Sequence, residues 1–155
     1  MKPLFVSFAF SAFALVAVAQ TAIAQSTEVT AINAVIERET KAYLDGDATA
    51  MANCWATIPE SGQLYSVPDG TVGYNPGMPG DIKKMMAGQK PTGGTFRNTN
   101  YQIRIKGDAA FAQFDQVASP PKGAKEYAHE TRYLEKFGAT WKIVHVGAVY
   151  YKPGK

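Results

Sequence analysis

The sequence predicts one α+β domain in which N-terminal helices pack on one face of a curved antiparallel sheet. Between Ser26 and Leu44 apolar residues recur at steps of three and four, whereas from Phe96 onward they occupy alternate positions. Turn residues divide the alternating part into successive hairpins. The chain has 155 residues, of which 46% are hydrophobic and 19% charged, and this is the composition of a single globular domain.

The charge and cysteine content exclude several classes of protein. The chain carries 16 Lys and Arg against 13 Asp and Glu, a net charge of +3. That field is too weak to recruit nucleic acid or an anionic membrane by charge alone. The one cysteine, Cys54, excludes a disulfide framework and a multi-cysteine zinc site. We expect Cys54 to be buried on a helix, and the alternatives are a reactive thiol or an intermolecular disulfide.

Residues 1–24 have the features of a secretory signal peptide. Lys2 supplies a positive start, Leu4–Val18 is an uncharged apolar run, and Ala22 and Ala24 are the small residues that a signal peptidase reads. A membrane-spanning helix is the alternative, but the apolar run is shorter than the roughly 20 residues that cross a bilayer. We therefore expect cleavage after Ala24. The domain is then residues 25–155, located in a bacterial periplasm or the medium and not in a membrane.

Two helices are predicted at the start of this domain. Over Ser26–Leu44 the apolar stripe consists of Val29, Ile32, Val35, Ile36 and Tyr43. Asp45-Gly46-Asp47 ends this helix, and Asp47 can cap a second one over Ala48–Trp55.

The segment between Pro59 and Gly94 is rich in proline and glycine, which excludes continuous secondary structure. Short elements are predicted there: strands over 63–67 and 71–74 around a turn at 68–70, a loop over 74–80, and a short helix over 81–87.

The first hairpin is predicted to turn at Gly107-Asp108 and to return over Ala109–Val117. Residues that pair across a hairpin share a face of the sheet, so the turn assigns the faces. The expected inner pairs are Ile105 with Ala110, Ile103 with Ala112, Tyr101 with Phe114, and Thr99 with Gln116. Asn100, Arg104, Phe111 and Asp115 are expected on the outer face.

The second hairpin is predicted over Glu126–Phe137 and Thr140–Tyr151, with a two-residue turn at Gly138-Ala139. Its expected inner pairs are Lys136 with Trp141, Leu134 with Ile143, Arg132 with His145, Glu130 with Gly147, and Ala128 with Val149. The outer face would then hold an apolar patch that indicates a partner: Tyr127, Tyr133, Val144, Val146 and Tyr150.

Several segments carry a family resemblance. The helical start Ala31–Ile36, the turn Lys106–Ala110 and above all the closing strand Trp141-Lys142-Ile143-Val144-His145 resemble the SnoaL-like branch of the nuclear-transport-factor-2-like superfamily. The resemblance implies a cone-shaped, cystatin-like roll in which a curved sheet wraps on helices around a pocket, and frequent dimers. The superfamily includes ketosteroid-isomerase-like enzymes, polyketide cyclases, dehydratases and noncatalytic association domains, so the fold leaves the activity open.

The candidate catalytic residues are His145 and Glu130, with Arg132 as a ligand-binding residue. On one apolar face they would form a base, an acid and an anion anchor, which suits abstraction of a proton next to a carbonyl group. The alternative is structural: Glu130 and Arg132 would form an ion pair that closes the cone, and His145 would be a satisfied core histidine.

Further ligand-binding candidates are Tyr65, Tyr101 and Gln116 as polar contacts, and Trp55 and Phe114 as apolar walls; plain core packing is the alternative for each. No metal site is expected, because His129 and His145 lie on opposite faces of the predicted sheet. No cofactor is indicated.

Three functions fit these observations. The first is binding of a small, mostly apolar ligand in the cone, with or without isomerase-, dehydratase- or cyclase-type acid-base chemistry. The others are a noncatalytic interaction module that dimerises through the outer face of the last two strands, and an immunity-type partner. An open cavity favours the first, whereas a cone filled by Tyr101, Trp55 and Phe114 favours the others.

Overall fold

The computed structural model describes residues 9–153, with side chains from residue 25 onward. It divides the chain into two compact units, Met1–Ala31 and Ile32–Lys155, and the site discussed below belongs to the second unit. Part of the predicted signal peptide, residues 1–8, lies outside the described residues. Across the described part of the chain, no helix combines the length and the hydropathy needed to span a membrane.

The helices follow the predicted order. Helix α1 (Ala9–Asp45) runs through the predicted start at Ser26 and ends one residue after Leu44. Gly46, at φ +71°, then turns the chain, and a Cβ there would lie 2.9 Å from the backbone oxygen of Gln89, so glycine also allows that segment to approach. As expected, the Asp47 carboxylate caps α2 (Ala48–Ala52) by accepting a hydrogen bond from the Ala50 amide at 2.8 Å. This helix ends before Trp55, which forms an isolated parallel bridge with Ile143.

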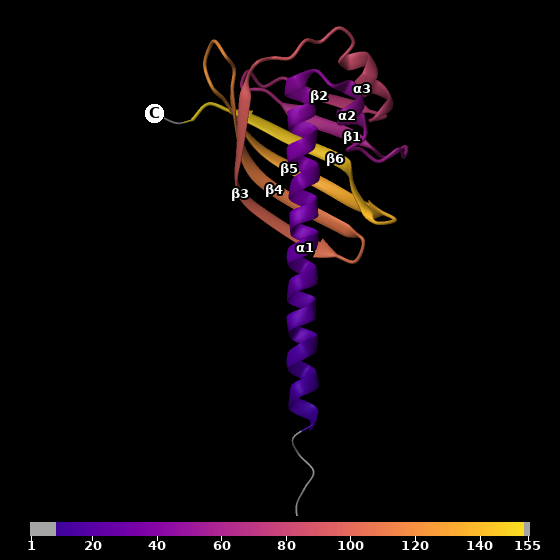
Figure 1. The fold of residues 1–155 in the computed structure, drawn as a ribbon. Helices are drawn as coiled ribbons and strands as arrows, with labels where there is room; N and C mark the ends of the chain where they lie inside the picture. The colour runs from indigo at the N-terminus through magenta and orange to yellow at the C-terminus, as the bar shows by residue number, and fades with distance from the viewer. Residues whose placement is uncertain (1–8, 154–155) are drawn as a thin grey trace, which may run out of the picture. The chain divides into compact units, whose positions relative to one another are not determined.

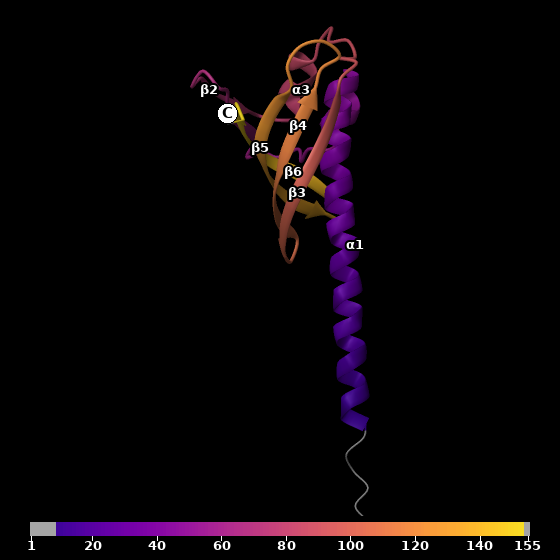
Figure 2. The ribbon, with the colours of Figure 1, turned by 90° about the vertical axis from the view of Figure 1, so that its left-hand side faces the viewer.

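Six strands form one curved sheet (Figure 1 and Figure 2). Their order across the sheet is β2-β1-β6-β5-β4-β3. The four long strands form the predicted antiparallel meander, while β1 pairs parallel with β6, so the sheet is mixed and not purely antiparallel. The bounds are β1 (Gly62–Ser66), β2 (Val72–Pro76), β3 (Thr95–Lys106), β4 (Ala109–Ser119), β5 (Glu126–Phe137) and β6 (Thr140–Tyr151).

The predicted loop over 74–80 begins later than expected because β2 continues to Pro76. Helix α3 (Gly80–Met85) follows at the predicted place. The core lies on the inner face of the sheet, against the last turns of α1 and against α2 and α3. Its fully buried side chains include Ile32, Ile36, Met78, Ile82, Phe114, Leu134 and Ile143.

The first hairpin keeps its predicted register next to the turn and loses it further away. Ile105 pairs with Ala110 and Ile103 with Ala112, as expected. A bulge between Thr99 and Gln102 then shifts the pairing, so that Asn98 rather than Thr99 lies opposite Gln116. Asn100 adopts φ 58° within this bulge. The predicted Thr99–Gln116 pair is therefore wrong, whereas Tyr101 and Phe114 both lie at the bulge and their rings pack with centres 4.9 Å apart.

The second hairpin also contains a bulge, and here it changes the faces. Leu134 pairs with Ile143 as predicted, but Tyr133 pairs with His145, so Val144 is an extra residue in β6. From this point each residue of β5 lies opposite a residue one position later than expected. Arg132 pairs with Val146, Glu130 with Ala148 and Ala128 with Tyr150. The predicted Arg132–His145, Glu130–Gly147 and Ala128–Val149 pairs are wrong.

Candidate functional site

A pocket of about 1110 Å³ opens on the inner face of the sheet. Four buried charged or amide side chains line it, Glu39 of α1, Gln116 of β4, and Glu130 and Arg132 of β5, with exposed fractions of 3–8%. We call these four residues the polar floor. The walls are largely aromatic and apolar and include Tyr43, Met51, Tyr65, Met85, Phe96, Tyr127 and Tyr150.

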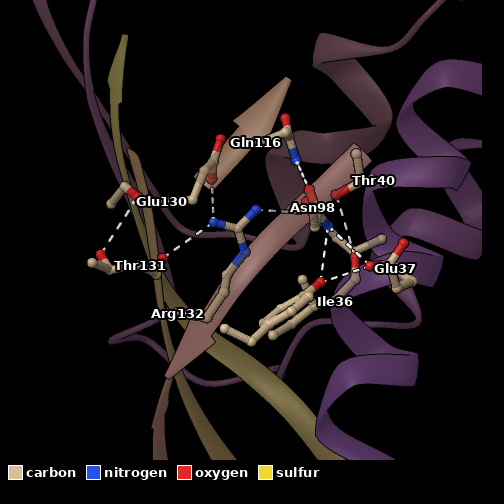
Figure 3. A network of polar contacts seen from close by, with 11 residues as sticks. Ile36, Glu37, Thr40, Asn98, Gln116, Glu130, Thr131 and Arg132 are labelled. Atoms are coloured by element: carbon tan, nitrogen blue, oxygen red, sulfur yellow. Dashed lines mark hydrogen bonds and ion pairs between the residues drawn. The ribbon is translucent and has the colours of Figure 1, made fainter. Parts of the chain in front are cut away.

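Arg132 is the centre of the polar floor (Figure 3). Its Nη1 donates to Glu130 Oε2 at 2.5 Å and to the Thr131 carbonyl at 3.1 Å, and its Nη2 lies 3.5 Å from Glu39 Oε2. The guanidinium also stacks 5.4 Å from the centre of the Phe114 ring. Glu130 and Arg132 lie two apart on β5, so both side chains point to the inner face. The two carboxylates keep the guanidinium charged, which raises the pKa of Arg132 despite its burial.

Glu39 is the titratable group of the floor. Burial raises the pKa of the Glu39 carboxyl, the neighbouring Arg132 opposes that rise, and the negative Glu130 adds to it. The Trp55 indole N–H also favours the ionised form of Glu39, although the two groups do not have the geometry of a full hydrogen bond. A buried carboxyl whose pKa is raised can take up or release a proton under mild conditions, which is the property of a general acid or base.

A chain of hydrogen bonds fixes the orientation of Gln116. The Glu37 carboxylate accepts from the Tyr101 hydroxyl at 2.7 Å and from Asn98 Nδ2 at 3.2 Å. Asn98 Oδ1 therefore faces away from Glu37 and accepts from Gln116 Nε2 at 3.1 Å (Figure 3). Because a carboxylate can only accept hydrogen bonds, Glu37 sets the direction of every hydrogen bond in this series. Gln116 consequently turns its carbonyl oxygen away from Asn98.

Tyr65 reaches the pocket wall because of the glycine opposite it. Gly73 of β2 pairs with Tyr65 of β1. A Cβ at Gly73 would lie 2.2 Å from Cζ of the Tyr65 ring, so only glycine leaves room for the ring in this position. The phenol thereby lies over β2 at the side of the pocket.

Apart from His145, the site residues predicted from the sequence separate into those that line the pocket and those that do not. Glu130, Arg132, Gln116 and Tyr65 line the pocket, as do the apolar residues Met51 and Met85. Trp55 and Phe114 are buried behind the polar floor, and Tyr101 packs on Phe114 with ring centres 4.9 Å apart. They support the floor and do not fill the pocket.

His145 does not join this site. The bulge at Val144 places His145 opposite Tyr133 of β5 and beside Gly62 of β1, and it is absent from the pocket lining. The expected group of Glu130, Arg132 and His145 on one face is therefore not formed. The partner that Arg132 has in place of the histidine is Glu39, 3.5 Å away.

Sequence reasoning missed Glu39, although the pattern contained a signal. Glu39 lies seven residues after Ile32, four after Val35 and three after Ile36, which places it in the apolar stripe of the helix. A carboxylate in such a stripe needs a buried partner. The partner is Arg132, on a strand far along the chain.

The remaining reactive groups lie apart from the pocket. Cys54 is buried as expected, but in the turn after α2 and not on a helix. Burial raises the pKa of its thiol to about 11, so it is a poor nucleophile. His129 contacts Asp115 at 3.0 Å on the outer face. Among the residues with described side chains, no cluster of His, Cys, Asp or Glu has the arrangement of a metal site.

Comparison with known proteins identifies structural neighbours only. No family model matches the sequence, and no curated protein shows significant sequence similarity to it. The structure is similar to an NTF2-like protein with a cystatin-like fold from Novosphingobium aromaticivorans, with 16% identity over 87% of this chain and 89% of that one and a TM-score of 0.65. It is also similar to an NTF2-like superfamily protein from Salmonella enterica serovar Typhimurium, with 22% identity over 84% and 94% of the two chains and a TM-score of 0.64. A third similar structure is an NTF-2-like protein of unknown function from Shewanella oneidensis, with 17% identity over 79% of this chain and 98% of that one and a TM-score of 0.64.

Proposed function

We propose that this domain, which has the cystatin-like fold of NTF2-like proteins, binds a small and mostly apolar ligand in the pocket above the polar floor. The observation that carries the proposal is the open volume of about 1110 Å³. Ligand sites in proteins are apolar and aromatic clefts of this order of size with a few placed polar groups. Tyr101, Trp55 and Phe114 lie behind the floor, so the pocket favours ligand binding over a filled interaction module.

The chemistry available to such a ligand centres on Glu39 in place of His145. Glu39 lies at the pocket and carries the raised pKa, while Gln116 and Tyr65 offer polar contacts. Isomerisation, dehydration and cyclisation of a carbonyl compound all require a proton to move at a carbon or oxygen atom. We assign that transfer to Glu39, with Glu130 and Arg132 holding its carboxyl in place.

The experiment compares ligand-induced thermal stabilisation in the wild type and in Ala118→Phe, which fills the pocket from β4. The matched control is Ala109→Phe, on the same strand and outside the pocket lining. The library consists of uncharged aromatic and alicyclic alcohols and ketones.

A ligand at a hundred times its dissociation constant stabilises the folded state by about 2.7 kcal/mol. We expect this in the wild type and the control and not in Ala118→Phe. Equal responses of all three proteins, or none in the wild type, would contradict the proposal.

We also propose that the chain is exported and acts as a homodimer through the outer face of the sheet. Two residues that were expected on that face, Val144 and Val146, are buried, and two others, Tyr127 and Tyr150, line the pocket. Other apolar side chains are exposed there, and they extend the patch over β1 and β2: Leu64, Val72, Tyr74, Phe111, Tyr133 and Val149. A patch of this kind on a soluble domain is typical of an interface.

A further inference from the structure

We propose that the pocket selects ligands whose inner end carries a protonated amine. This inference rests on the proposed ligand-binding function and specifies the charge of the ligand. Three independent features of the site support it: the charge balance of the polar floor, the orientation of Gln116, and the aromatic walls.

The charges of the polar floor do not balance. Arg132 contributes one positive charge, and it already pairs with both Glu130 and Glu39. With both carboxylates ionised, the floor therefore carries a net negative charge, and the guanidinium is not available as an anchor for an anion. Lys125 and Lys152 also line the pocket, but both are exposed, so solvent screens their charges from the floor. An ammonium group would supply the missing positive charge, whereas a carboxylate ligand would add to the excess.

The hydrogen-bonding groups of the floor point to a donor on the ligand. One of the two N–H groups of the Gln116 amide donates to Asn98, and the Gln116 carbonyl oxygen can accept a hydrogen bond from a ligand. The carboxylates of Glu39 and Glu130 are acceptors as well. The floor also offers two donors, which are Arg132 Nε, without a hydrogen-bond partner among the described residues, and the second N–H of Gln116, but the acceptors outnumber them. An ammonium group has three donors and no acceptor, which matches this set.

The walls of the pocket favour the same charge. Tyr43, Tyr65, Phe96, Tyr127 and Tyr150 all line it. Aromatic faces attract cations through their quadrupole and also pack against the apolar body of a ligand. Burial raises the pKa of the Tyr150 hydroxyl to about 12, so this ring remains neutral.

Binding of an amine should be coupled to loss of a proton. The groups that face Glu39 are Arg132 and Glu130 from β5 and Trp55 and Cys54 from the segment after α2. Glu39 is the carboxyl among them whose pKa is raised, chiefly by burial. An ammonium group stabilises the ionised carboxylate, so it displaces the proton of Glu39. The affinity for an amine should therefore increase as pH rises through the pKa of Glu39, and the affinity for an alcohol should not.

The test uses three probes with one apolar body: 1-naphthylmethylamine, 1-naphthylmethanol and 1-naphthoate. Isothermal titration calorimetry in two buffers of different ionisation enthalpy gives both the affinity and the number of protons exchanged. We expect the amine to bind about tenfold more tightly than the alcohol, since hydrogen bonds to charged groups are stronger than neutral ones. We expect the carboxylate to bind most weakly, and proton release with the amine alone.

Glu39→Gln is the diagnostic variant, because its neutral amide matches the protonated carboxyl in shape. It should abolish the preference for the amine and the proton release, and it should retain binding of the alcohol. Glu126→Gln makes the same chemical change at an exposed position of the pocket lining and should leave the preference within about twofold, as a screened surface charge contributes little.

A stronger affinity for the alcohol or the carboxylate, or a preference for the amine that survives in Glu39→Gln, would overturn the inference. So would failure of the amine to bind. None of these results would affect the proposed function, because that proposal depends on uncharged ligands and on the Ala118→Phe comparison. If no uncharged compound of the library stabilised the wild type, both the proposed function and this inference would be refuted.

Discussion

Replacing Arg132 by methionine tests whether the polar floor is held together by charge. The change keeps most of the side-chain volume and removes the guanidinium. Arg132 is 4% exposed, and the two carboxylates that it contacts are 5% and 3% exposed, so little solvent reaches the charges that its removal would leave uncompensated. Removing one partner of a buried ion pair costs about 3–5 kcal/mol, because the other charge remains buried and uncompensated. A domain of this size has a stability of roughly 5–15 kcal/mol, so the variant should fold with little margin.

The loss of stability in Arg132→Met should depend on pH, and Glu39 determines whether it grows or shrinks as pH rises. In the wild type the pKa of Glu39 is already raised by burial, and Arg132 limits that rise. Without Arg132 the pKa rises further. A carboxyl whose pKa is higher in the folded state stabilises the protein most below its unfolded pKa, and this contribution is lost as pH rises through the folded pKa. Arg132→Met should therefore approach wild-type stability in mild acid and lose most stability at neutral pH and above.

Urea denaturation at pH 5 to 8 measures the effect. The control is Arg104→Met on β3, which removes an exposed arginine and should change the free energy of unfolding by less than about 0.5 kcal/mol. The double variant Arg132→Met with Glu39→Gln should recover part of the loss. A loss that is independent of pH, or smaller than about 1 kcal/mol, would refute the argument that Arg132 compensates buried charge.

Three further predictions concern other parts of the chain. Leu64→Lys combined with Val149→Lys should convert the proposed homodimer into a folded monomer in light scattering, since both side chains are exposed on the outer face; a wild type that is monomeric at high concentration would contradict the proposed interface. The intact mass of the exported protein should correspond to a chain that begins at Gln25; a membrane-associated product that retains residues 1–24 would contradict the signal prediction. Asp47→Ala should lower the free energy of unfolding by about 1 kcal/mol, because it removes the cap of α2, and unchanged urea denaturation would show that the cap contributes nothing.

The parts of the fold that depend on local pattern were predictable from the sequence. The bounds of β5 and β6 agree with the prediction at every end, because alternation and a glycine turn define both strands. The cap at Asp47 and the turn near Asp69 also follow from local chemistry. Both hairpin registers are correct for the pairs next to the turn.

Long-range features were not predictable in the same way. The parallel pairing of β1 with β6 joins residues about 80 positions apart, and neither strand carries a mark of it. The bulge at Val144 lies among β-branched residues that would fit a regular strand equally well. The bulge in β3 did leave a signal, since asparagine is among the residues that tolerate the positive φ of Asn100.

The candidate site shows how a small error of register becomes a chemical one. Strand parity assigned Glu130 and Arg132 to the inner face, and the structure places both there. The same parity, counted across an unseen bulge, assigned His145 to that face as well. The buried partner of Arg132 is a helical carboxylate, Glu39, and helix and strand faces can be related only once their packing is known.

The bulge at Val144 also matters when homologous strands are aligned. Because Val144 has no partner on β5, a protein that lacks this one residue could keep the pairing of Arg132 with Val146 and of Glu130 with Ala148. Two such proteins would share the same pocket while differing by one in the spacing between the tryptophan near the start of β6 and the β6 residues that lie opposite Arg132 and Glu130. Equivalent positions in this strand are therefore defined by their partner on β5. Counting along the chain from Trp141 would align His145 with the residue opposite Arg132, a position that Val146 occupies in this chain.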